Sequence, residues 1–533
     1  MSQSLEKFHQ YTEFLLKQEK NPIQPDREAP VKIALVFPND YEVGMANLGY
    51  QTLYRLLNSY PGVLCERAFM YHAFPDITRT LESKWQLTHF DVIAFSASFE
   101  ADYSNMVHTL SNIGINPLAD KRHPDDPLIL AGGTATFINP EPIAPFIDLF
   151  VIGEIEPVAD ILVDHLRDLR TGKNAKTDIL QSLSHIDGMY VPQFFSAENK
   201  IIRLTNDSRN SVPQFSPIIT PKSHFQNMFL IEVGRGCGRF CRFCAASHVY
   251  KPVRFFSPQH ILTTIHENIH STKKIGLIGA ALCDYPHLIE VGTELIREKY
   301  QLGLSSFRFD AISEDFLNII EKGGVRTITL APEAGSERLR KIINKPITDE
   351  RILHSIKLIS QFDIPSIKLY FLIGLPFENE CDLEAIISLV SKIRSIYFAK
   401  TSKRREITVS INAFIPKPFT PFQWAPMDSE KNLRKKRRFI DSELRKIKGI
   451  KFNRKNIKDE ILQCTLSLGN RDTGLNFMKQ ADLWIPDASN SDYSEIHKEK
   501  SYTDILPWDF IEYPIRREKL WQLWQKSAEF AGV

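Results

Sequence analysis

The 533-residue sequence contains no long uninterrupted apolar run, no strong charge imbalance and no internal repeat. A transmembrane helix needs about 18 or more consecutive apolar residues, so none is expected. The net charge of +2 suggests neither a nucleic-acid binder nor a membrane-surface protein. The start, MSQSLEKFHQYTEFLLKQEK, lacks the apolar stretch and small-residue cleavage site of a signal peptide. We therefore expect a cytoplasmic globular protein of several domains.

Cysteine is also scarce, with seven in the chain, and a disulfide framework is not expected in the cytoplasm. Three of the seven, Cys237, Cys241 and Cys244, nevertheless fall within the stretch GRGCGRFCRFCA. A structural zinc site would need four ligands, usually in two pairs, and the sequence has no second pair. Three thiolates on a four-iron cluster would leave one iron open to a substrate or cofactor. The motif therefore predicts a metal site with an open position.

Short β-branched runs alternate with helical periodicity in residues 31–170, as in VKIALVFP, DVIAFSAS and LILAGGTATF. This pattern predicts an open parallel, Rossmann-like α/β sheet whose ligands bind beyond the carboxyl ends of the strands. Residues 1–30 are expected to form an N-terminal helical segment. Residues 171–224 read as a connector with a small hairpin in 188–204.

A second βα series in residues 225–425 predicts six strands, and six successive units favour a partial TIM-type barrel with its chemistry in the loops after the strands. Within LSSFRFDAI, Arg308 and Asp310 alternate with Phe307 and Phe309. Period two then predicts that the polar pair faces the barrel lumen, where a substrate would bind; a plain internal ion pair is the alternative. Residues 426–533 are expected to be a mostly helical C-terminal extension.

The stretch VGRGCGRFCRFC, at the end of the first predicted barrel strand, resembles the radical S-adenosylmethionine (SAM) superfamily. The resemblance covers residues 228–424 and implies a [4Fe-4S] cluster held by the three cysteines. In that superfamily SAM chelates the open iron, and an electron from the cluster cleaves it to methionine and a 5′-deoxyadenosyl radical. A reducing partner such as flavodoxin or ferredoxin is implied as well.

The same resemblance implies a set of SAM-binding residues. Phe243 fits the adenine-side position before the last cysteine, and Glu333 in APEAGSERLRKIINK fits the carboxylate that contacts the polar part of SAM. Gly374 and Pro376 in FLIGLPFE, and Pro416 in NAFIPKPFTPFQW, match the ends of the next two strands.

The N-terminal sheet resembles the cobalamin-binding domain that precedes the barrel in one radical SAM subclass. The resemblance assigns cobalamin to positions at the strand ends: Ser96, Gly132, Gly133 and Glu154, with Tyr41 and Gly44. The departure is at Tyr41, because the spacing D-x-H-x-x-G that supplies a lower histidine ligand reads Asn39-x-Tyr41-x-x-Gly44 here. A phenol with a pKa of about 10 is a poor cobalt ligand, so histidine-on binding is not expected.

These patterns leave three hypotheses about the function open. The first is a cobalamin-dependent radical SAM transferase that methylates an unactivated carbon of an unknown substrate. The second is a radical SAM enzyme without cobalamin that performs rearrangement, cyclisation or sulfur insertion. The third is a nucleic-acid-binding protein with a structural or sensing cluster, because residues 431–460 hold 13 Lys and Arg against 4 Asp and Glu. A solvated helix face explains that basic stretch better, since its apolar residues fall near helical spacing.

Overall fold

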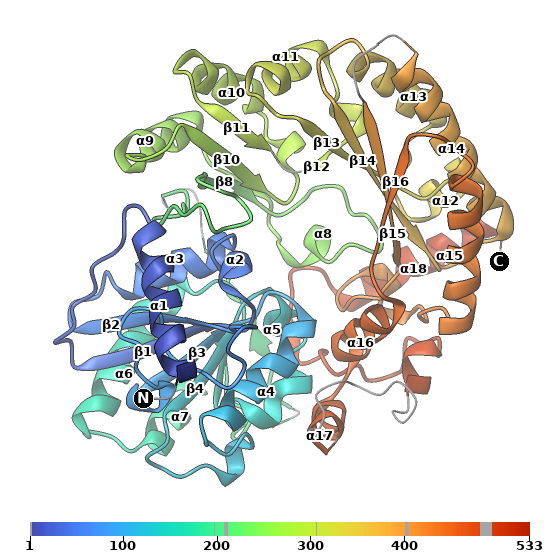
Figure 1. The fold of residues 1–533 in the computed structure, drawn as a ribbon. Helices are drawn as coiled ribbons and strands as arrows, with labels where there is room; N and C mark the ends of the chain where they lie inside the picture. Colours follow the sequence, from blue (N-terminus) through green and yellow to red (C-terminus); the bar gives the residue numbers. More distant parts are fainter. Residues whose placement is uncertain are drawn as a thin grey trace.

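The structure is a computed structural model that describes residues 3–196, 198–206, 212–304, 306–399, 405–479 and 493–532. A parallel sheet with helices on it forms the N-terminal region, a partial barrel follows, and a mostly helical extension borders both (Figure 1). The predicted fold class is thereby confirmed. Of the helices described, none is long and apolar enough to cross a membrane.

The N-terminal sheet has the strand order β2-β1-β3-β4-β5-β6. The first five strands are parallel and β6 is antiparallel to β5. Both faces are apolar, because helices cover each side. The strands are β1 (Val31–Phe37), β2 (Val63–Phe69), β3 (Val92–Ser96), β4 (Leu128–Gly132), β5 (Leu149–Val151) and β6 (Met189–Tyr190). The helices are α1 (Gln3–Gln18), α2 (Tyr41–Gly44), α3 (Leu48–Leu57), α4 (Tyr103–Asn112), α5 (Thr134–Ile138), α6 (Ala159–Thr171) and α7 (Lys176–Leu183).

This order determines where a ligand can bind. The chain runs outward from β1 to β2 on one side and from β3 to β5 on the other, so the crossovers reverse between β1 and β3. Helices on opposite faces separate at such a switch point and leave a crevice at the carboxyl ends of the strands. We therefore expect the N-terminal site at that edge.

The barrel is formed by two sheets, one with the strand order β11-β10-β8-β9 and one with the order β12-β13-β14-β15-β16. All paired strands are parallel except the short β9, which is antiparallel to β8. The strands are β8 (Phe229–Arg235), β9 (Arg254–Phe255), β10 (Lys274–Gly279), β11 (Gln301–Leu304), β12 (Ser306–Phe307), β13 (Thr327–Glu333), β14 (Ser366–Ile373), β15 (Glu406–Ala413) and β16 (Ile450–Arg454). The helices are α8 (Ala246–Val249), α9 (Pro258–Asn268), α10 (Leu288–Arg297), α11 (Glu314–Lys322), α12 (Glu337–Ile342), α13 (Asp349–Ile359) and α14 (Glu380–Phe398).

Two local predictions were wrong. The segment LSSFRFDAI is not one strand, because β12 ends at Phe307 and residues Phe309–Ala311 form a 3-10 turn closed by an Ala311 N–H bond to the Arg308 carbonyl. The predicted hairpin in 188–204 does not form either. Instead β6 pairs with β5, and β7 (Ile201–Ile202) pairs with β17 (Ile511–Glu512) far along the chain.

The C-terminal extension contains α15 (Glu430–Leu444), α16 (Ile457–Leu468), α17 (Arg471–Lys479) and α18 (Arg517–Ala531). Leu433, Ile440 and Leu444 are buried on one side of α15, and most of its cations face solvent. The extension also supplies β16, the edge strand of the second barrel sheet, which pairs in parallel with β15. Its contribution to the barrel is therefore larger than the sequence predicts.

Candidate active site

The three cysteines lie in the loop that follows β8, the first strand of the barrel, as the sequence predicts. Gly236 has φ +87°, and a Cβ there would lie 2.1 Å from the Tyr250 carbonyl oxygen, so a glycine lets the loop pass this close. The Lys251 ammonium donates to the Cys237 carbonyl at 2.9 Å, and a His248 ring nitrogen lies 3.0 Å from the Cys241 carbonyl. These bonds hold the backbone of the loop from one side.

The end of α12 holds the same loop from the other side. The Arg242 N–H donates to the Ile343 carbonyl at 3.0 Å, and the Asn344 amide donates to the Phe240 carbonyl at 2.9 Å. The Phe422 N–H, in the segment that follows β15, donates to the Arg242 carbonyl at 3.1 Å. Two segments that are expected to bind SAM, residues 331–345 and 412–424, thus contact the cysteine loop directly.

Glu333 lies close to this loop at the end of β13. Its φ of +66° is unusual for a non-glycine residue, and its carboxylate accepts a bond of 3.0 Å from the Lys345 ammonium. Both charges act on the Cys241 thiol. A residue with a strained backbone, whose carboxylate is held beside a predicted metal loop, is typical of a functional position.

The other expected SAM residues surround this edge of the barrel. Phe243 is half-buried against the main core, and Pro416 is buried after β15. Gly374 and Pro376 follow β14, which pairs with β13, and the Gly374 N–H donates to Glu378 at 2.9 Å. Their roles stay predictions.

The donor set fits an iron–sulfur cluster. Burial raises the pKa of the Cys241 thiol to about 12 and also raises the pKa of Cys244, so without metal these thiols stay protonated, whereas metal binding deprotonates a thiol. Within the described residues no three His, Cys, Asp or Glu side chains converge as ligands of a single ion. Cluster thiolates bind different irons and need not converge on one point. The other cysteines lie apart, in β2 (Cys65), after β10 (Cys283), in α14 (Cys381) and in α16 (Cys464).

Arg308 and Asp310 form an ion pair of 2.7 Å across the 3-10 turn. Phe307 packs against Phe316 of α11, on the helix side of the sheet, at a ring-centroid distance of 5.2 Å. Arg239 of the cysteine loop lies 3.8 Å from the Asp310 carboxylate, and its Nε donates to Asp284 at 2.8 Å. The pair therefore belongs to a charged network beside the cysteine loop, and both the lumen role and the simple ion pair stay open.

A cavity of about 450 Å³ lies between the carboxyl edge of the N-terminal sheet and β8. Its lining includes four of the six residues assigned to cobalamin by resemblance: Ser96, Gly132, Gly133 and Glu154. Gly133 has φ +108°, and a Cβ there would lie 2.4 Å from the Ala97 carbonyl oxygen, so only glycine lets the ends of β3 and β4 come this close. The cavity continues along β8 to Gly236, one residue before Cys237.

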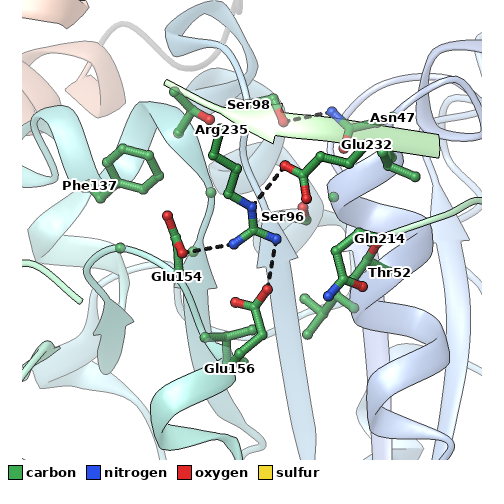
Figure 2. Close-up of a pocket in the computed structure, with 18 of the residues that line it drawn as sticks. Asn47, Thr52, Ser96, Ser98, Phe137, Glu154, Glu156, Gln214, Glu232 and Arg235 are labelled. Atoms are coloured by element: carbon green, nitrogen blue, oxygen red, sulfur yellow. Dashed lines mark hydrogen bonds and ion pairs between the residues drawn. The ribbon is translucent and has the colours of Figure 1, made fainter. Parts of the chain in front are cut away.

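Arg235 lies in the wall of the cavity among three carboxylates (Figure 2). Its guanidinium lies 2.8 Å from a carboxylate oxygen of each of Glu154, Glu156 and Glu232. The second oxygen of Glu232 is buried and has no hydrogen-bond partner in the described part of the chain. Burial raises the pKa of this carboxyl group, against the effect of Arg235. Glu232 and Arg235 were not predicted as residues of this cavity, although two charges inside the apolar strand FLIEVGR were a usable signal.

Tyr41 and Gly44 are not among the residues that line the cavity. The Tyr41 hydroxyl donates to Glu19 at 2.7 Å, and Arg67 donates to the same carboxylate at 2.7 Å. Burial raises the pKa of Tyr41 well above its usual value, so the phenol stays neutral. A Cβ at Gly44 would lie 2.5 Å from the Phe69 ring, which explains the glycine by packing. The assignment of these two residues to a cobalamin loop is therefore not supported by where they lie.

Comparison with known families decides the identity of the chain. A model of the radical SAM superfamily matches residues 231–390, and a model of the N-terminal region of radical SAM proteins matches residues 49–192. The chain belongs to the radical SAM superfamily. This confirms the resemblance inferred from the cysteine motif.

Several known proteins are similar to this chain. The uncharacterized protein MJ0966 of Methanocaldococcus jannaschii is 28% identical over 440 residues, which is 82% of this chain and 88% of that protein. The ribosomal protein uS12 methylthiotransferase RimO of Thermodesulfovibrio yellowstonii is 24% identical over 31% of this chain and 41% of its own. The cobalamin-dependent SAM radical enzyme OxsB with aqua-cobalamin bound aligns with a TM-score of 0.53 and 14% identity, over 94% of this chain and 80% of that chain. This last likeness shows a shared fold.

Proposed function

We propose that this radical SAM enzyme is cobalamin-dependent and transfers a methyl group to an unactivated carbon of its substrate. One observation carries the proposal: the cavity at the switch point of the N-terminal sheet extends along β8 to the start of the cysteine loop. A cofactor in this cavity would face the cluster loop. A reduced flavodoxin or ferredoxin is the expected electron donor.

The chain's own residues would bind and orient the reacting groups. When bound, SAM on the cluster supplies the 5′-deoxyadenosyl radical and cobalamin supplies a methyl donor. Cys237, Cys241 and Cys244 would hold the cluster, while Lys345 holds the Glu333 carboxylate in place for the polar part of SAM. The apolar cavity walls, such as Phe95 and Phe137, would exclude water from the radical.

The cavity residues fit cobalamin chemically. Its peripheral carboxamides donate N–H groups, and the unpartnered Glu232 oxygen is a buried acceptor in the wall. A Cβ at Gly132 would have no neighbour closer than 3.8 Å, so this glycine leaves room that a side chain would fill. Tyr41 points to Glu19, which favours binding without a lower ligand from this loop.

The test compares two variants after anaerobic reconstitution with iron, sulfide and hydroxocobalamin, by measuring iron and cobalt per chain. The Gly132→Leu side chain fills the cavity without backbone strain and should remove cobalt while iron is retained. The variant Cys237→Ala/Cys241→Ala/Cys244→Ala should lose about four irons and keep cobalt. Iron without cobalt in the wild type, or cobalt that Gly132→Leu leaves unchanged, would contradict cobalamin dependence.

The second candidate is a radical SAM enzyme without cobalamin, for example one that inserts sulfur. The similarity to RimO and to tRNA-2-methylthio-N(6)-dimethylallyladenosine synthase of Clostridioides difficile favours it. However, the chain spans only about two fifths of the length of these methylthiotransferases. A second cluster would need a further set of cysteines, and Cys283, Cys381 and Cys464 lie on three separate elements. Iron without cobalt would select this candidate.

A further inference from the structure

A second cavity, of about 280 Å³, lies between α15 and the loop that follows β16. Its lining is dominated by cations: Arg434, Arg437, Arg438, Asp441, Arg454, Lys455, Asn456 and Ile457. Five positive side chains therefore surround the cavity together with one carboxylate. A concave cluster of this kind attracts anions more strongly than isolated surface cations do.

Nearby carboxylates neutralise only part of this charge. Arg434 pairs with Glu430 at 2.8 Å, and Arg454 pairs with Asp441. Lys455 instead lies over the Phe99 ring at 5.1 Å. For Arg438, which is exposed, no partner is found within the described residues. Among the residues that the structure describes, Lys455 and Arg438 thus have no carboxylate partner.

Arg437 gives an independent indication of a ligand. It is only 8% exposed, and its terminal nitrogens donate to Glu460 at 2.8 Å and to the Lys455 carbonyl at 2.7 Å. Its Nε is buried and has no acceptor in the part of the chain that the structure describes. A buried donor without an acceptor is costly, and a bound oxyanion would satisfy it.

The backbone adds to this attraction. The 12-residue helix α16 begins at Ile457, with Asn456 as its N-cap, and both residues line the cavity. The N-terminus of a helix favours anions. Asp459 and Glu460 in the first turn oppose this effect, but Glu460 is engaged by Arg437 and by the Ala413 N–H at 2.8 Å.

The cavity lies at the catalytic edge of the barrel. Arg454 ends β16, which pairs in parallel with β15, and the segment after β15 binds the cysteine loop through the Phe422 N–H. Lys455 contacts Phe99, which follows Ser98 in the wall of the larger cavity. A ligand bound to Lys455 here would lie close to Phe99, next to the wall of the larger cavity.

We propose that this pocket, bounded by α15 and the start of α16, binds the phosphate group of a small phosphate monoester or free inorganic phosphate. The bounded cavity and its converging cations fit a compact dianion. The proposal does not depend on whether cobalamin binds.

The test is isothermal titration calorimetry of the full chain with inorganic phosphate and with glycerol 3-phosphate, at an ionic strength fixed with sodium chloride. We expect saturable binding at one site by the wild type. Arg438→Gln should weaken it about tenfold or more, because one charge-assisted contact is lost. Asp441→Asn should strengthen it, because the carboxylate that lines the pocket is removed.

Arg445→Gln is the matched control, since Arg445 is exposed just after α15 but does not line the pocket. It should bind like the wild type. Tighter binding of glycerol 3-phosphate than of inorganic phosphate would indicate that the pocket binds a phosphate monoester. Binding of inorganic phosphate alone would indicate that it binds the free anion. Either result supports the proposal. No saturable binding by the wild type, or equal weakening in Arg438→Gln and Arg445→Gln, would overturn it.

Discussion

At the scale of residues, the chemistry of this radical SAM enzyme is concentrated in groups whose ordinary properties are changed by their surroundings. The thiol of Cys241 is held protonated by burial until metal binds. The carboxylate of Glu333 is held in a strained backbone conformation beside it. Asp102, next to the loop after β3, is a carboxyl group whose protonation is altered by burial. Each change can be measured separately.

Asp102 should make stability depend on pH. Its pKa is raised to about 6, mainly by burial and also by Glu100 and Asp40, against the effect of a bond from the Asn39 amide. Because the folded state holds the proton more tightly, this contribution is present below about pH 4 and is lost as the pH rises through about 6. The loss is at most about 3 kcal/mol.

Asp102→Asn should remove this loss. Its free energy of unfolding, measured with urea, should therefore rise relative to the wild type between pH 4.5 and pH 7. A difference between the two proteins that is the same at both pH values would refute the assignment.

The positive φ of Glu333 should lower the free energy of unfolding. Both Glu333→Gly and Glu333→Ala remove the carboxylate and its bond to Lys345, but only glycine relieves the positive φ. The glycine variant should therefore be more stable than the alanine variant by about 1 kcal/mol in urea unfolding. SAM binding should be lost in both, as measured by equilibrium dialysis of the reconstituted protein. Equal stability of the two variants would argue against strain.

At the scale of elements, the cysteine loop depends on structure that is distant in sequence. The end of α12 and the segment after β15 bind its backbone. Helix α18 lies against these supports, and its Phe530 ring stacks under Arg242 at 5.3 Å and under Lys341 at 4.9 Å. The C-terminal helix thus contacts the cysteine loop and its support, although the loop lies about 280 residues earlier in the sequence.

Trp524→Ala should test that support. Trp524 is buried and packs against Phe377 and Phe422, at centroid distances of 5.4 and 5.6 Å. Its removal should lower the free energy of unfolding by about 3–5 kcal/mol and should speed the loss of iron to a chelator. The control Gln525→Ala, on the exposed face, should change stability by no more than about 0.5 kcal/mol. Unchanged iron loss in Trp524→Ala would separate α18 from the loop.

Elements with a strong local pattern were predictable from the sequence, and those that depend on remote partners were not. Five of the six proposed barrel strands form as expected, because they are long and rich in β-branched residues. Strand β2 was missed because VLCERAF carries Glu66 and Arg67, whose burial is possible only with partners such as Glu19 and Ser83. Strand β16 was missed because IKFNR is short and polar, and its pairing with β15 stabilises it.

At the scale of the whole molecule, the cavity of about 450 Å³ exists only because the N-terminal sheet and the barrel pack together. One apolar core extends from the N-terminal sheet through the barrel to α18. Polar contacts secure the joint: the Asn139 amide donates to the Gly469 carbonyl at 2.8 Å, and Lys417 pairs with Glu100. Four residues expected from the sequence, Ser96, Gly132, Gly133 and Glu154, line the cavity, but the grouping of Arg235 with Glu154, Glu156 and Glu232 could be seen only in the assembled structure.

The most direct test of the account is the formation of 5′-deoxyadenosine from SAM by the reduced, reconstituted protein under anaerobic conditions. The account predicts its formation by the wild type and by Cys283→Ala, which lies outside the cysteine loop, and its loss in Cys241→Ala. Cleavage of SAM by Cys241→Ala at the wild-type rate, or no cleavage by a wild-type protein with its full iron content, would contradict the claim that this loop holds the catalytic cluster.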